Sequence, residues 1–202
     1  MDFSELPVMI HTCRYYVPTT DILYPMVYGL ENPEVQKEIN DEIYDLMLDI
    51  AAELRRPDLL TNITGSYEIK ANQRDLLSLT LVQLGDFGGA HPMTIIKALN
   101  IDVFTAEIYQ LEDLFEPNSD YIERLSNMVK EQIAEREILI INEFESISPQ
   151  QDYYLVDNNL IIFFQLYEIT PYAFGFPYFP IPIYKLEDII KEDGPLSRMM
   201  GV

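Results

Sequence analysis

The feature that most constrains the fold is an apolar run at Leu160–Ile169, with the sequence LIIFFQLYEI. The run has the length of a strand, and Pro171 and Gly175 follow closely enough to end it. Apolar runs of this length are typical of strands covered by protein along most of their length. This one is also too short to cross a membrane. We therefore predict a strand at the centre of a sheet.

Other segments rich in β-branched and aromatic residues predict further strands, and polar turns join several of them into hairpins. Asp157–Asn159 joins the central strand to a preceding one, and Asn72–Asp75 is a four-residue turn of a second hairpin. Three prolines between Phe176 and Tyr184 restrict that segment to an edge or an extended crossing. The other predicted strands cover Val8–Val17, Ile22–Gly29, Ile63–Ala71, Leu76–Leu84, Met93–Thr105 and Asp152–Val156.

Two long helices are predicted from apolar residues at spacings of three and four. The first opens at Asn32-Pro33, a favoured N-cap followed by a proline at the first helical position, and ends before Pro57. The second spans about Asp120–Ile140, with Asn118 or Ser119 as its cap. Leu111–Phe115 and Leu186–Ile190 predict short helical turns, and residues 194–202 predict a loose C-terminal end.

Strands and helices do not alternate strictly, which favours an α+β fold over a doubly wound sheet. We predict antiparallel sheets with two long amphipathic helices packed on one face. Two modules are predicted, at residues 10–92 and 93–190, and we expect them to pack as one compact unit.

The formal net charge of −21 limits the partners that the chain can attract. Such a surface repels nucleic acid phosphates and anionic lipid heads, which makes both poor partners. A basic protein would be attracted over a distance, and salt would weaken the attraction. The alternative is that the acidity only keeps the chain soluble.

Residues Met1–Glu5 lack the basic and apolar regions of a signal peptide. This leaves two alternatives: a cytoplasmic protein, or one whose export segment or anchor is not part of this sequence. The single cysteine, Cys13, cannot form an internal disulfide, and this says little about whether the protein is cytoplasmic or exported.

The sequence carries few signs of catalysis. His91 lies in a Gly-Gly-Ala-His-Pro loop, where it could act as a base or contact a partner, although a structural role is the simpler interpretation. Glu168 ends the apolar run beside Tyr167 and close to Tyr172, and a tyrosine hydroxyl could donate to it. No nucleotide-binding loop, nucleophile elbow or metal-ligand spacing is present, so we predict no cofactor, no metal and, on balance, no enzyme.

Several short motifs in order resemble one family. Tyr24-Pro25, Gly29-Leu30, Asn32 and Ile39-Asn40 resemble the start of the module found in PdaC-type peptidoglycan deacetylases and the anti-sigma factor RsiV. Companion C-terminal motifs are Gly88–Pro92, Leu111–Phe115, Tyr167–Ile169 and Pro171–Gly175. The resemblance covers about residues 15 to 190. Ala106 departs from it, since the family usually has Gly there, and predicts a slightly different backbone.

The resemblance implies an extracytoplasmic α+β domain pair that binds or senses in the bacterial cell envelope. In RsiV the pair binds lysozyme, and in PdaC it accompanies a separate deacetylase domain. The leading hypothesis is therefore a non-enzymatic domain that binds a basic, lysozyme-like protein. The alternative is a domain that binds or modifies cell-wall glycan, peptidoglycan included. The residues proposed for binding are His91, Tyr167, Glu168 and Tyr172.

Overall fold

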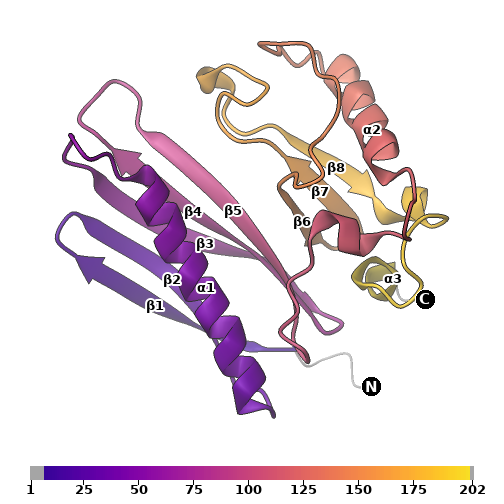
Figure 1. Cartoon of the computed structure of the whole chain (residues 1–202), viewed down its shortest axis with the longest axis horizontal. Helices are drawn as coiled ribbons and strands as arrows, with labels where there is room; N and C mark the ends of the chain where they lie inside the picture. The colour runs from indigo at the N-terminus through magenta and orange to yellow at the C-terminus, as the bar shows by residue number, and fades with distance from the viewer. Residues whose placement is uncertain (1–6, 201–202) are drawn as a thin grey trace. The chain divides into compact units, whose positions relative to one another are not determined.

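The computed structural model describes residues 7–200, which form two compact units divided between residues 108 and 109. The first unit contains a five-stranded sheet and one long helix, and the second contains a three-stranded sheet with several helices (Figure 1). The strand at residues 93–102 belongs to the sheet of the first unit, because it pairs along its whole length with the strand before it. The boundary between the units in the sequence therefore lies about 16 residues after residue 92, where the predicted N-terminal module ends.

The sheet of the first unit has the strand order β1-β2-β3-β4-β5. Neighbours pair antiparallel except β2 and β3, which run parallel over three residue pairs from Thr20 with Ile63 to Ile22 with Gly65. The sheet is therefore mixed, and the prediction of purely antiparallel pairing was wrong for this pair. The strands span β1 Met9–Val17, β2 Thr20–Tyr28, β3 Asn62–Gln73, β4 Leu76–Asp86 and β5 Met93–Asp102.

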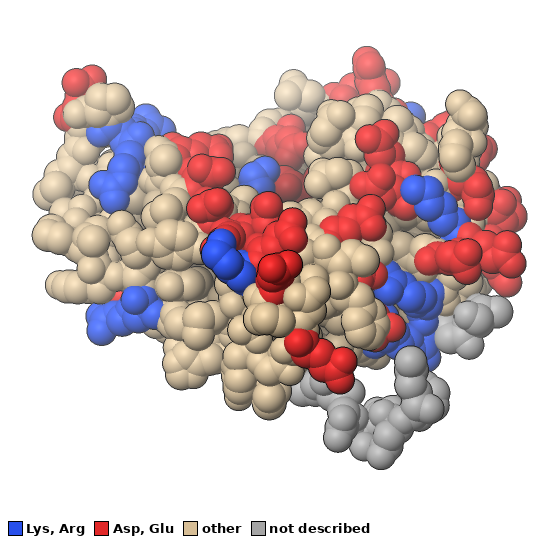
Figure 2. Space-filling model, turned by 60° about the horizontal axis from the view of Figure 1, so that its bottom comes forward, with Lys and Arg blue, Asp and Glu red and all other residues tan. Residues whose placement is uncertain are grey.

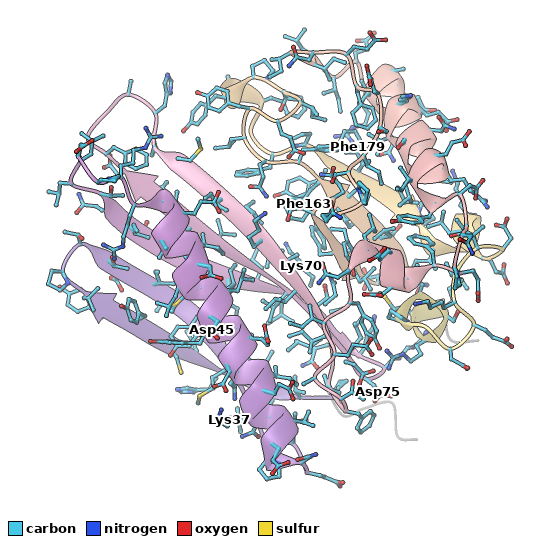
Figure 3. All side chains as sticks on the ribbon, in the orientation of Figure 1. Lys37, Asp45, Lys70, Asp75, Phe163 and Phe179 are labelled. Atoms are coloured by element: carbon cyan, nitrogen blue, oxygen red, sulfur yellow. The ribbon has the colours of Figure 1, made fainter. Side chains whose placement is uncertain are left out.

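Helix α1, Pro33–Leu54, forms where the sequence predicts it. The Asn32 side chain accepts a hydrogen bond from the backbone N–H of Glu34 at 3.0 Å, which satisfies one free donor of the first turn. The helix packs against β2, β4 and β5 through a buried apolar stripe. Lys37 and Asp45 lie on its solvent-exposed side (Figure 3).

Two asparagines fasten the first hairpin to the rest of its unit. The Asn40 side chain of α1 accepts from the backbone N–H of Val27 at 2.7 Å and donates to the same residue's carbonyl at 2.9 Å. Asn72 of β3 makes the same pair of bonds with Val8, at 3.2 and 2.8 Å. Each amide thus replaces the two hydrogen bonds that a neighbouring strand would supply.

The second unit is built on the antiparallel sheet β6-β7-β8, with β7 in the middle as predicted. Phe163 of β7 and Phe179 of β8 both bury their rings fully (Figure 3). Helix α2 packs against β8. The elements span η1 Leu111–Leu114, α2 Tyr121–Glu135, β6 Tyr153–Val156, β7 Asn159–Phe163, η2 Tyr172–Phe174, β8 Tyr178–Pro182, η3 Ile183–Leu186 and α3 Pro195–Met200.

Three predictions for this unit were wrong in detail. The central strand ends at Phe163, and the rest of the apolar run is a loop. Helix α2 stops at Glu135, and its N-cap is Asp120, which makes no side-chain capping bond. Residues 195–200 are helical, with Leu196 and Met199 buried, where a loose end was predicted.

The structure is α+β, as predicted, but the two long helices do not share one sheet face. Helix α1 contacts the five-stranded sheet, and α2 contacts the three-stranded one. Between residues 7 and 200, none of the helices combines the length and the hydropathy that a membrane span requires.

Candidate functional site

A tight turn at Gln165–Glu168 replaces the predicted continuation of the central strand. The backbone N–H of Glu168 donates to the carbonyl of Gln165 at 3.2 Å, which closes a four-residue turn. Tyr167 occupies the third position with φ +66°, a conformation usually left to Gly or Asn. A tyrosine held there against its backbone preference is typical of a site where strain serves function. Its side chain is 47% exposed.

Glu168 fastens this turn. Its carboxylate accepts a hydrogen bond from the backbone N–H of Gln165 at 2.7 Å and a long one from the side chain of Gln151 at 3.5 Å. These amides are its donors, in place of the tyrosine hydroxyl proposed from the sequence. The Glu168 side chain is also exposed, which removes the need to compensate a buried charge.

Tyr167 and Tyr172 come together on the exposed side of this loop. Their ring centroids lie 5.5 Å apart with the planes tilted by 31°. Phe174 follows on the same loop and is 43% exposed. The backbone N–H of Phe174 bonds to the Pro171 carbonyl at 2.9 Å, so the aromatic residues sit on a loop held by its own hydrogen bonds.

The loop after α2 lies against this aromatic loop. The backbone N–H of Ile141 donates to the carbonyl of Ile169 at 3.0 Å. Ile141 is 43% exposed and Leu139 is 71% exposed, although both are large and apolar. We call the two segments, residues 137–145 and 165–176, the paired loops. They expose apolar side chains from both segments, as binding surfaces commonly do.

The paired loops are also acidic. They carry Glu168 and three further exposed glutamates, with no lysine or arginine in either segment. The three are Glu137, Glu143 and Glu145. Exposed apolar side chains in segments that also carry carboxylates offer a cationic protein both buried area and long-range attraction.

His91 lies in the first unit, in the loop between β4 and β5, and its side chain is exposed. Asp86 fixes the start of this loop by accepting from the backbone N–H of Gly88 at 2.8 Å. Arg56 lies over the ring of Phe87, 4.7 Å from its centroid. The loop is therefore held by local contacts, and His91 belongs to a different unit from Tyr167, Glu168 and Tyr172.

An open cleft of about 400 Å³ lies along the first turns of α2. Its lining includes Tyr121, Lys130 and Glu145, and it contains none of the four residues proposed from the sequence. Burial raises the pKa of the Tyr121 phenol, and the charges of Glu112 and Asp113 add to this effect.

The sequence did not identify Leu139, Ile141 or Phe174 as candidate site residues. The available signal was the apolar segment at residues 138–141, which directly follows a helix whose apolar stripe has already been completed. The chain leaves the helix at Glu137, which has φ +50°, and beyond it Leu139 and Ile141 are exposed while Ile138 is buried.

The chain is similar to several known proteins. Residues 112–184, which contain both of the paired loops, match a family described as "Protein of unknown function (DUF3298)". The chain resembles two solved structures of DUF3298 family proteins. For one from Bacteroides fragilis NCTC 9343 the TM-score is 0.66 at 14% identity, covering 98% of both chains. For one from Pseudomonas aeruginosa PAO1 it is 0.69 at 15% identity, covering 94% of this chain and 96% of the other. At these identities the likeness shows the fold.

Two curated proteins of Bacillus subtilis (strain 168) are similar in sequence. The anti-sigma-V factor RsiV is 25% identical over 193 residues, which are 84% of this chain and 65% of RsiV. The peptidoglycan-N-acetylmuramic acid deacetylase PdaC is 20% identical over 133 residues, which are 62% of this chain and 28% of PdaC. The chain thus spans less than two thirds of the length of either protein. The resemblance seen in the motifs is confirmed: the chain is a relative of RsiV and PdaC, and its residues 112–184 match the DUF3298 family.

Proposed function

We propose that this chain is a non-enzymatic binding domain of the bacterial cell envelope, and that it binds a basic, lysozyme-like protein through the paired loops. The observation that carries the proposal is Tyr167, which is held at positive φ and exposed beside Tyr172 within an acidic surface. Rigid exposed aromatics are the side chains that most often dominate protein interfaces. The location in the envelope rests on the relationship to RsiV and PdaC.

The roles of the residues differ within this proposal. Tyr167, with the neighbouring apolar side chains, supplies buried contact area, and Tyr172 supports the Tyr167 ring. Glu168 keeps the turn closed and contributes charge at its edge. The net charge of −21 accelerates encounter with a cationic partner, so the association rate should fall as salt rises.

Titration calorimetry of this chain with a cationic lysozyme, repeated over a series of salt concentrations, tests the proposal. We expect saturable binding of one lysozyme per chain, weakened by Tyr167→Ala by about tenfold or more. Tyr184→Ala is the matched control, because Tyr184 is 67% exposed in the same unit and lies outside the paired loops. No heat at low salt, or equal affinity for an unrelated basic protein, would contradict the proposal.

The tilted pair Tyr167 and Tyr172 also favours a second candidate, binding of cell-wall glycan, because sugar rings pack on aromatic faces. In this alternative Glu168 supplies a polar contact beside the two rings. Soluble peptidoglycan fragments in the same calorimeter discriminate the two candidates. Binding of fragments that Tyr167→Ala abolishes and Tyr184→Ala leaves unchanged, with no binding of lysozyme, would favour the glycan.

A further inference from the structure

The five-stranded sheet of the first unit ends in an open edge. Strand β1 pairs with β2 over its full nine residues, and among residues 7–200 no strand pairs with its other side. A long strand with one unpaired side presents a row of backbone donors and acceptors to any strand that can approach. Its sequence, MIHTCRYYV, contains no proline and is rich in residues that favour strands.

Strand β8 shows that the same protein protects a sheet edge elsewhere. This edge strand contains Pro180 and Pro182, which cannot donate to another strand. Helix α2 and its C-cap residue bond to its carbonyls as well, since Gln132 donates to the Pro180 carbonyl at 3.0 Å and Arg136 donates to that of Tyr178 at 2.7 Å. Strand β1 contains no proline, so its open edge keeps all of its backbone donors and is suited to pairing with another strand.

The charge around β1 favours another copy of this chain as the partner. Between residues 7 and 30 the only Lys, Arg, Asp or Glu residues are Arg14 and Asp21. They form a two-pronged ion pair at 2.7 and 2.8 Å, so the hairpin is locally neutral in a chain of net charge −21. Carboxylates are sparse at the left of the face drawn in Figure 2, the side on which Figure 1 draws β1 and β2. Two copies can meet there with little electrostatic repulsion, whereas a cationic partner would find little electrostatic attraction there.

The hairpin geometry identifies the groups that face outward. Val17 and Thr20 pair across a two-residue turn, so they form a hydrogen-bonded pair, and the odd-numbered residues of β1 bond to β2. The even-numbered residues Ile10, Thr12, Arg14 and Tyr16 therefore direct their backbone groups toward the open edge. Tyr16 is also 69% exposed, which is unusual for a large aromatic residue in a sheet.

We infer that two copies of this chain associate through antiparallel pairing of β1 with β1, which joins their sheets into one. The register with full overlap pairs Met9 with Val17 of the second copy and is centred on Cys13. Arg14 then lies opposite a threonine, so the two arginines do not face each other directly. The two Cys13 residues form a non-hydrogen-bonded pair with Cα atoms about 4.5 Å apart, a separation within the range of disulfides.

Light scattering of the whole chain after size exclusion, over a wide range of concentrations, tests the association. We expect a reversible dimer under reducing conditions. Tyr16→Pro removes one outward N–H from each copy and should weaken the dimer about thirtyfold, because two hydrogen bonds are lost. Tyr16→Ala keeps the N–H and should weaken it much less. Circular dichroism shows whether each variant remains folded. A monomer at all concentrations, or equal effects of the two variants, would overturn the inference.

Oxidative cross-linking with copper phenanthroline tests the register independently of these variants. The oxidant removes two electrons from a pair of Cys13 thiols, which release two protons and form a disulfide between copies. The double variant Cys13→Ser/Tyr16→Cys places the only thiol at a more exposed position that faces Ile10 of the second copy in this register. We expect the native chain to cross-link faster than the double variant. Faster cross-linking of the double variant would indicate random collision and would contradict the register.

Discussion

Asn40 of α1 holds Val27 of β2 by both of its backbone groups, through hydrogen bonds of 2.7 and 2.9 Å. Val27 is fully buried, so these groups have no access to water that would replace a lost partner. The asparagine thus joins helix to strand at a point where the sheet itself provides no neighbour on that side.

Replacing Asn40 should destabilise the first unit. Asn40→Ala leaves a buried N–H and a buried carbonyl unsatisfied, and we expect the free energy of unfolding to fall by about 2 kcal/mol. Urea unfolding followed by circular dichroism measures this change. Asn142→Ala is the control, because Asn142 is an exposed loop residue and should change stability by less than about 0.5 kcal/mol. Similar losses for both variants would contradict the role assigned to Asn40.

Gln83 should tolerate an apolar replacement despite its complete burial. Its amide nitrogen donates to the Met47 carbonyl at 2.7 Å, while its Oε1 has no hydrogen-bond partner in the part of the chain that the structure describes. The Met47 carbonyl lies inside α1 and retains its bond within the helix. Gln83→Met should therefore leave the free energy of unfolding unchanged within about 1 kcal/mol, or raise it.

Gln83→Ala is the matched comparison. It removes the same amide and also leaves a cavity, so we expect a loss of about 2 kcal/mol. If the methionine variant lost as much as the alanine variant in urea unfolding, the hydrogen bond to Met47 would be more important than the packing.

Substitutions of Tyr167 should separate stability from binding. Tyr167→Gly and Tyr167→Ala both remove the ring, but glycine accepts φ +66° without the steric cost that alanine has there. We expect the glycine variant to be more stable than the alanine variant by about 1 kcal/mol, with lysozyme binding equally weak in both. Thermal unfolding and calorimetry on the same samples measure the two effects. Equal stability would show that the turn relaxes once the ring is removed.

The ion pair between Arg124 and Asp188 should make the second unit less stable in acid. The hydrogen bond from Arg124 at 2.6 Å holds the pKa of the Asp188 carboxyl below its usual 3.8. A carboxyl with a lowered folded-state pKa stabilises the fold above its unfolded pKa, and this contribution disappears as pH falls through the folded value. Asp188→Asn should therefore reduce stability at pH 7 and have less effect at about pH 2.

Asp193→Asn is a control for the overall effect of removing one negative charge, because no ion pair holds Asp193 in the part of the chain described. Unfolding of both variants and of the native chain at the two pH values completes the test. A loss for Asp188→Asn that is equally large at both pH values would contradict the assignment.

Regular patterns allowed the first unit to be predicted well from the sequence. The Asn32-Pro33 start of α1, its apolar stripe and the hairpin partners of β3 and β4 all depend on local spacing. The parallel pair of β2 and β3 was missed because it joins segments on either side of α1, and no local pattern reports such a pairing. The two-residue turn Arg74-Asp75, with both residues at positive φ, is also tighter than the four-residue turn predicted.

In the second unit, a tight turn overrides the apolar pattern. The apolar run at Leu160–Ile169 continues past Phe163, but the chain turns at Tyr167 because hydrogen bonds from Gln165 and Glu168 close the loop. In the first unit, Ala106 was expected to give a slightly different backbone from the glycine usual in the family, yet its φ of +62° lies in the region that glycine adopts readily. The backbone is strained at Tyr167 and at Ala106, and neither composition nor periodicity predicts this strain.

The short parallel contact between β2 and β3 has a consequence for how the first unit assembles. The β1–β2 hairpin and α1 are each local in the sequence, whereas Thr20 cannot meet Ile63 until the whole of α1 has been traversed. The search for that contact carries the entropy of closing a long loop, so it comes late in folding. We therefore expect the hairpin and the β3–β5 meander to form before they pair with each other, and α1 to bring them together.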